Sequence, residues 1–277
     1  MKRQVLFRTV VDVDRLNLEV QPCEPILLVG SCFADNIGKC LREAAFPVTV
    51  NPYGVMYNPV SVRHTVEKVD FDGRIVFLTL GTNHVYVLKE TGEVVDNCQK
   101  RPQRLFQETV LDVDACYDNL AATVALLQKR RQDVKVVVTV SPIRYAKYGF
   151  HGSAISKAVL LLAADRLAKD FPHHVCYFPA YEIVNDELRD YRFYAPDMLH
   201  PSQQAVDYLW QRLVESCFSE AAIKYLDEWR PVKEALGHRP FDAESEAYRS
   251  FKALTQQKLK LLHEKYPGMH IEPAWME

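Results

Sequence analysis

The chain has 277 residues, of which 48% are hydrophobic and 25% charged, and its formal net charge is −2. This composition is typical of one large globular domain or two small ones, and it excludes a disordered, collagen-like or coiled-coil chain. The near-neutral charge creates no field that would gather nucleic acid or an anionic membrane surface, so neither is expected as a partner.

Short apolar segments alternate with helix-like segments along most of the chain. The segments that predict β-strands are Pro25–Val29, Pro47–Val50, Arg74–Leu80, Val134–Val140 and Val175–Phe178. The segments that predict helices are Ala34–Phe46, Val113–Arg131, Ser153–Phe171 and Ser202–Phe218. Because strands that are apolar on both faces need helices on both faces, this alternation predicts an α/β fold with a mostly parallel central sheet.

Two regions depart from the alternation. A Thr91-Gly92 turn between two short alternating runs predicts a small hairpin after the third strand. Near the C-terminus, breakers such as Pro231 interrupt the pattern before a helix expected over Ala243–Lys265. We therefore expect an α/β domain over residues 1–228 and a helical extension packed on it over residues 229–277.

The sequence also predicts a cellular compartment. No apolar run approaches the roughly 20 residues of a membrane span, and charged residues interrupt the N-terminal stretch where a signal peptide would be apolar. A cytoplasmic protein is therefore expected. The seven cysteines are scattered, with no CxxC and no zinc-type cluster, so reduced thiols and no metal site are expected.

Candidate site residues follow the predicted strands, where ligands bind in parallel sheets. Ser31 lies between the first strand and a helix, a position that suits either a nucleophile or a helix cap. Gly54 and Asn83 follow the second and third strands, and with the Ser31 N–H they offer three donors for an oxyanion, although each is also typical of a turn. Cys32 is a weaker nucleophile candidate, since a small thiol here commonly packs against the core.

Three further candidate positions carry a charge or a titratable ring. Asp197 and His200 lie three residues apart, a spacing that lets the carboxylate orient one imidazole nitrogen and leave the other for Ser31. An isolated pair of this kind is also typical of a helix cap beside a surface histidine. Arg144 follows the fourth strand and is suited either to clamp a substrate carboxylate or phosphate or to fix its loop through a salt bridge.

The segment Gly30-Ser31-Cys32-Phe33-Ala34 resembles the signature of the GSCFA-domain family, and the resemblance covers roughly residues 20–230. Further segments that resemble family blocks, in family order, are Asn51–Gly54, Tyr57–Pro59, Leu80–Thr82, Asn97–Pro102, Thr139–Arg144 and Asp197–Pro201. The family in turn resembles the SGNH, or GDSL-like, hydrolases.

This resemblance implies a three-layer α/β/α fold of flavodoxin-like topology and a serine esterase or acyl hydrolase without a metal or organic cofactor. The implied substrates are esters such as O-acetylated carbohydrates or lipids. Position by position, the resemblance implies Ser31 as nucleophile, Asp197 and His200 as its partners, and Gly54 and Asn83 as oxyanion donors.

The chain departs from the superfamily pattern at two places, and the second of them, in the third block, keeps a second function open. Ser31 is preceded by Gly30 without the usual Asp, and His84 stands where the superfamily usually has Asp. A non-catalytic protein that binds a carbohydrate or acyl ligand in the same pocket is the alternative. A dinucleotide-binding domain is disfavoured because the chain lacks GxGxxG at this turn. The sequence does not specify an oligomeric state.

Overall fold

The computed structural model describes residues 8–13, 15–96, 98, 101–242, 244–272 and 275. Five parallel strands form the central sheet in the order β2-β1-β3-β7-β8. They are β1 (Ile26–Gly30), β2 (Val48–Val50), β3 (Ile75–Leu80), β7 (Lys135–Val140) and β8 (Val175–Tyr177). Counted along the chain, this is the 2-1-3-4-5 order of flavodoxin-like sheets, so the expected fold class and topology are confirmed.

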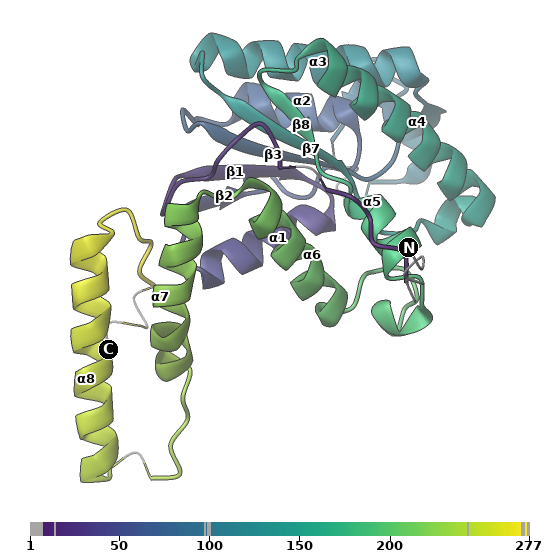
Figure 1. Cartoon of the computed structure of the whole chain (residues 1–277). Helices are drawn as coiled ribbons and strands as arrows, with labels where there is room; N and C mark the ends of the chain where they lie inside the picture. The colour runs from purple at the N-terminus through teal and green to yellow at the C-terminus, as the bar shows by residue number, and fades with distance from the viewer. Residues whose placement is uncertain are drawn as a thin grey trace, which may run out of the picture.

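Helices cover both faces of this sheet (Figure 1). One face packs against α1 (Cys32–Glu43) and α6 (Gln203–Cys217), and the other against α2 (Pro59–Lys68), α3 (Val113–Arg130) and α4 (Gly149–Asp170). Successive strand residues alternate between the two cores: Ile26 and Leu28 of β1 belong to the first, Leu27 and Val29 to the second. The three-layer arrangement is therefore built from strands that are apolar on both sides.

A second, antiparallel sheet has the order β5-β4-β6. The strands β4 (His84–Leu88) and β5 (Val94–Val95) form the predicted hairpin, and β6 (Phe106–Val110) adds a third strand that the sequence analysis did not predict. The helix α2 was also not predicted. Its start is defined by Asn58, whose side chain accepts the Ser61 N–H, followed by a proline in the first turn.

The C-terminal part forms a hairpin of α7 (Glu220–Leu236) and α8 (Glu246–Lys265), which projects away from the sheet in Figure 1. The break expected at Pro231 is wrong, because α7 begins at Glu220 and continues through this proline. The missing proline N–H costs one helical hydrogen bond, but buried Trp229 and Val232 on either side keep the helix packed. Ala243, where the second helix was expected to begin, lies outside the described residues.

Short helical turns complete the chain: η1 (Gln103–Leu105), η2 (Ala146–Tyr148), α5 (Ala180–Glu182), the π-helical η3 (Ile183–Glu187) and η4 (Tyr191–Phe193). The N-terminal segment runs beside the end of α6, where Val20 forms a bridge with Phe218. In the part of the chain that the structure describes, no helix is both long and apolar enough to cross a bilayer.

Candidate functional site

Ser31 lies where β1 ends and α1 begins, as predicted. Its hydroxyl accepts the Phe33 N–H at 3.3 Å, which makes it the N-cap of α1, and lies 3.1 Å from the Thr79 hydroxyl. The residue is 0% exposed. Ser31 is therefore held at a helix N-terminus, but its hydroxyl has no open path to solvent in this conformation.

Neighbouring strands fix the backbone around Ser31. Gly30 has φ +147°, and a Cβ added there would lie 2.1 Å from the Thr79 carbonyl oxygen, so only glycine fits. The Asn51 side chain links the ends of β2 and β1: its oxygen accepts the Gly30 N–H at 2.9 Å and its nitrogen donates to Asp35 at 2.8 Å. Sequence reasoning placed Asn51 in a segment that resembles a family block but gave its side chain no role, and it did not single out Thr79.

Asp197 and His200 form a pair on the loop before α6. Asp197 Oδ2 lies 2.6 Å from His200 Nδ1, while Oδ1 accepts the backbone N–H groups of Leu199 and His200. The hydrogen bonds from the His200 and Leu199 backbone and the His200 ring lower the Asp197 pKa to about 2. The carboxylate is therefore ionised near neutral pH, and it favours the tautomer that carries its proton on Nδ1.

The strand order determines how far Ser31 lies from this pair. The Asp197–His200 loop is tied to the end of β7, because the Arg144 N–H donates to the Leu199 carbonyl at 3.0 Å. Strands β1 and β7 flank β3, and two strand spacings place their ends about 10 Å apart. Among the described residues no hydrogen bond joins Ser31 to His200, whose side chain is 42% exposed.

The three expected oxyanion donors each have another acceptor in the structure. The Ser31 N–H donates to the Thr79 carbonyl at 3.0 Å, and the exposed Gly54 donates its N–H to Asn51 at 2.8 Å. Asn83 is buried, and its Nδ2 donates to the Leu111 carbonyl at 2.6 Å. An amide nitrogen carries two hydrogens, so Asn83 retains one donor, and the oxyanion role of these residues stays a prediction.

Arg144 braces the loop that carries the pair. Its guanidinium donates to the Met198 carbonyl at 3.1 Å and lies between two rings, 4.2 Å from the centroid of Phe150 and 5.3 Å from that of Tyr194. Within the described ranges Arg144 forms no ion pair. The salt-bridge interpretation of Arg144 therefore has no support in the structure, whereas its contact with the Asp197–His200 loop is direct.

His84 belongs to a cluster on the small antiparallel sheet. Its ring stacks on Tyr148 with centroids 3.6 Å apart, and its Nδ1 lies 3.4 Å from Glu108. Lys147 contacts the same carboxylate at 2.9 Å and the Tyr86 hydroxyl. Desolvation lowers the His84 pKa, so the ring is neutral near pH 7 and packs as an aromatic group.

Lys157 on α4 is a buried lysine that sequence reasoning missed. Its Nζ donates to the carbonyls of Gly81 at 2.6 Å and Ser141 at 2.7 Å, which are the residues directly after β3 and β7. Burial lowers its pKa to about 7. Lys157 therefore ties together two strand ends at the edge of the sheet where Ser31 lies.

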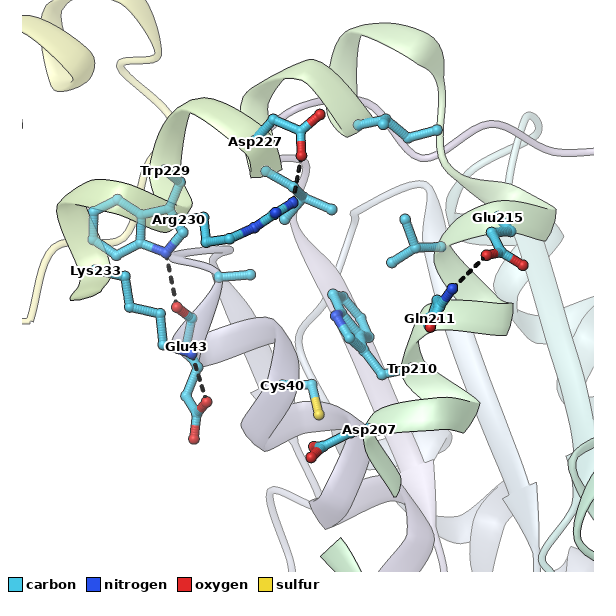
Figure 2. A pocket seen from close by; sticks show the side chains of 14 residues that line it. Cys40, Glu43, Asp207, Trp210, Gln211, Glu215, Asp227, Trp229, Arg230 and Lys233 are labelled. Atoms are coloured by element: carbon cyan, nitrogen blue, oxygen red, sulfur yellow. Dashed lines mark hydrogen bonds and ion pairs between the residues drawn. The ribbon is translucent and has the colours of Figure 1, made fainter. Parts of the chain in front are cut away.

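A separate cavity of about 630 Å³ lies between α1, α6 and α7 (Figure 2). Trp210 lines it, and Trp229 and Lys233 both contact Glu43 at its edge. Glu43 is the last residue of α1, whereas Ser31 caps the first turn of this 12-residue helix. A helix of that length spans about 18 Å, so this cavity is remote from the candidate site. No three His, Cys, Asp or Glu side chains in the described part of the chain converge as metal ligands.

Comparisons with known proteins identify a family. The sequence profile of the GSCFA family matches residues 25–75 and 71–213, and that of the "GSCFA domain protein, C-terminal domain" matches residues 229–273. Within the expected family segment Asn97–Pro102, the residues Asn97, Gln99 and Lys100 lie outside the described residues. A search of curated proteins gives no match.

Solved structures show more distant similarity. A catalytic mutant of an acetylxylan esterase from Geobacillus stearothermophilus has 12% identity, with a TM-score of 0.47 over 73% of this chain and 98% of that chain. A GDSL-like lipase from Bacteroides thetaiotaomicron has 15% identity, with a TM-score of 0.45 over 71% of this chain and 91% of that chain. These similarities are too distant to transfer an activity or the role of a residue.

Proposed function

Since the chain belongs to the GSCFA family, whose signature resembles that of the SGNH hydrolases, we propose that it is a serine esterase or acyl hydrolase. Ser31 is the nucleophile, His200 the general base and acid, and Asp197 the residue that orients His200. The substrate is an ester, such as an O-acetylated carbohydrate. Transfer of the acyl group to an alcohol instead of water uses the same steps.

The observation that carries this proposal is the Asp197–His200 pair. Asp197 Oδ2 lies 2.6 Å from Nδ1, which leaves Nε2 as the nitrogen that can accept a proton. The pair is anchored at the end of β7, and Ser31 stands at the end of β1, with a single strand between them. Residues at neighbouring strand ends are the usual source of active-site groups in parallel sheets.

The reaction follows from these groups. The reaction requires His200 Nε2 to come within hydrogen-bond reach of the Ser31 hydroxyl. As the Ser31 oxygen then attacks the ester carbonyl carbon, its proton passes to Nε2, and the ionised Asp197 stabilises the imidazolium. The tetrahedral intermediate then expels the alcohol, which takes the proton from His200. Water, deprotonated by the same nitrogen, hydrolyses the acyl-enzyme and regenerates the Ser31 hydroxyl.

Burial of Ser31 adds a requirement to this proposal. Because the residue is 0% exposed, side chains around it must move before an ester reaches the hydroxyl. Tyr57 is one nearby side chain: it is 40% exposed, and its hydroxyl contacts the Sγ of Cys32, the residue after Ser31, at 3.7 Å. Movements of exposed side chains of this kind are fast compared with typical turnover.

The test is hydrolysis of 4-nitrophenyl acetate and of acetylated xylan by the full chain. Ser31→Ala should abolish turnover of both. Because this change also removes a helix cap, the matched control is Ser219→Ala, which removes the serine whose hydroxyl caps α7 by accepting the Ala222 N–H at 3.1 Å. Each change should cost about 1 kcal/mol of stability. Turnover by Ser31→Ala equal to that of Ser219→Ala would exclude Ser31 as the nucleophile.

The second candidate function is a non-catalytic protein that binds a carbohydrate or acyl ligand. It is favoured by the burial of Ser31 and by the carbonyl acceptors that already hold the Ser31, Gly54 and Asn83 donors. This function predicts saturable binding of acetylated xylo-oligosaccharides in calorimetry without any release of acetate. Acetate release that depends on Ser31 would rule it out.

A further inference from the structure

Two adjoining cavities lie next to the Asp197–His200 loop. The larger, of about 320 Å³, is lined by Arg144, Arg189, Asn185, Asp190, Tyr191 and Tyr194, among others. The smaller, of about 100 Å³, shares Arg144 and Asn185 with it and adds Lys157. Because they share these residues, we treat them as one region beyond the ends of β7 and β8, which we call the arginine pocket.

Positive charge exceeds negative charge in the arginine pocket. The two arginines Arg144 and Arg189 line it, and the residues named above include one acid, Asp190. The Asp190 carboxylate accepts the Arg192 backbone N–H at 2.9 Å and lies 3.9 Å from the Arg192 guanidinium. Its negative charge is therefore paired with Arg192 and not with Arg144 or Arg189. In the described part of the chain neither arginine forms an ion pair; Arg189 is exposed, but Arg144 is half-buried, where an unpaired cation is uncommon.

Arg144 is held in position to bind a ligand. One of its N–H groups donates to the Met198 carbonyl, and the rings of Phe150 and Tyr194 flank the guanidinium. Fixing the planar guanidinium in this way reduces the entropy lost when its remaining N–H groups bind an oxyanion. Guanidinium groups match the geometry of carboxylate and phosphate.

The arginine pocket is also adjacent to the reacting groups. The Arg144 N–H donates to Leu199, the residue that precedes His200. A group bound by Arg144 is therefore held beside the imidazole. Tyr191, which is 72% exposed, offers an aromatic face at the edge of the same cavity, and such faces pack against the apolar part of a ligand.

We propose that the arginine pocket binds a carboxylate or phosphate group carried by the ester substrate, so that the protein prefers an acidic ester to a neutral one. Arg144 and Arg189 bind the anion, and Tyr191 and Tyr194 pack against the atoms that connect it to the ester. The preference for an acidic ester rests on the function proposed above, whereas binding of the anion itself does not.

The first experiment compares kcat/KM for 4-nitrophenyl acetate with kcat/KM for the 4-nitrophenyl monoester of succinic acid. Wild type should prefer the succinate ester. In Arg189→Gln the ratio of the two values should fall about 10- to 100-fold, the loss typical of a charge-assisted hydrogen bond. The control is Arg192→Gln, an exposed arginine three residues along that does not line either cavity and should leave the ratio unchanged. An equal ratio in wild type and Arg189→Gln would overturn the proposal.

The second experiment measures binding of succinate and of inorganic phosphate by calorimetry, without any reaction. Saturable binding of either that Arg189→Gln weakens at least tenfold supports the arginine pocket and shows which anion it accepts. If no ester is hydrolysed but this binding is found, the proposed function fails and the anion site stands. If 4-nitrophenyl acetate is hydrolysed but neither anion binds, the anion site fails and the proposed function stands.

Discussion

Asp197 accepts three hydrogen bonds, and its replacement by asparagine separates their roles. In Asp197→Asn the Oδ1 atom can still accept the backbone N–H groups of Leu199 and His200, so the loop should keep its conformation. The amide NH₂ would face His200 Nδ1 and favour the wrong tautomer. We predict that kcat for 4-nitrophenyl acetate falls about 10³- to 10⁴-fold, with an unchanged urea midpoint. A loss smaller than tenfold would contradict the role of this carboxylate.

Lys157 predicts a pH dependence of stability. Its pKa falls from the ordinary 10.5 to about 7 because burial disfavours the charged amine. Between these two values the unfolded chain binds more protons than the native protein, so the Lys157 contribution to stability rises with pH over this window, at up to about 1.4 kcal/mol per pH unit. Below about pH 7 the amine is protonated in both states and its contribution is constant.

Lys157→Met removes this titration. Urea unfolding at several pH values should show that the free energy of unfolding of wild type, relative to Lys157→Met, rises from pH 7 to pH 10. The control is Lys169→Met on the same helix, an exposed lysine paired with Asp165, which should leave the pH dependence of wild type intact. Parallel pH curves for wild type and Lys157→Met would show that Lys157 is not titrating in this range.

At the scale of single residues, the sequence predicts local pairs better than distant ones. Asp197 and His200 meet because only two residues of one loop separate them. The contact of Lys157 with Gly81 and Ser141 depends on which strands are neighbours, and that order is not encoded near any one of these residues. Likewise, the acceptor of the Asn83 amide lies 28 positions away, at Leu111.

The turn from β1 into α1 depends on Gly30. A Cβ there would lie 2.1 Å from the Thr79 carbonyl oxygen, so Gly30→Ala must push β1 and β3 apart. We predict a loss of about 3 kcal/mol or more in urea unfolding, from the clash together with backbone strain. Gly92→Ala is the control: its φ is +73°, and no atom lies within 4 Å of the added Cβ, so strain alone should cost about 1 kcal/mol. Equal losses of stability in the two variants would show that the close approach of β1 and β3 at Gly30 does not exclude a Cβ.

Elements whose apolar pattern is continuous were predicted, and those defined by tertiary contacts were not. All five strands of the parallel sheet are short apolar runs, and each was found within a few residues of its observed bounds. By contrast, β6 is mostly exposed and polar, and only its pairing with β4 makes it a strand. Helix α2 buries Ser61 and Thr65 together with Val62 and Val66, so polar residues interrupt its apolar face in the sequence.

For the molecule as a whole, α7 is the helix through which the projecting hairpin contacts the α/β layers. The Tyr225 hydroxyl donates to the Ala44 carbonyl and the Trp229 indole to the Glu43 carbonyl, both at 2.8 Å. These carbonyls lie at the C-terminus of α1, where helical acceptors lack partners. The expected division at residue 228 stays a prediction, but α7 crosses this position without a break.

This anchoring predicts that the hairpin and the α/β layers unfold together. Tyr225→Phe removes one hydrogen bond to α1 and should lower stability by about 1 kcal/mol or more, since a buried acceptor loses its partner. Calorimetry should still show one transition at a lower temperature. Two separate transitions in wild type would show that residues after 228 form an independent unit.

The central claim is that Ser31 is a nucleophile activated by His200. The most direct measurement treats the folded full chain with a fluorophosphonate, digests it and maps the modified residue by mass spectrometry. We predict a single phosphonylated residue, Ser31, with labelling lost in Ser31→Ala, slowed in His200→Ala and retained in Ser219→Ala. Modification elsewhere, or none under conditions where a known serine esterase is fully labelled, would contradict the account.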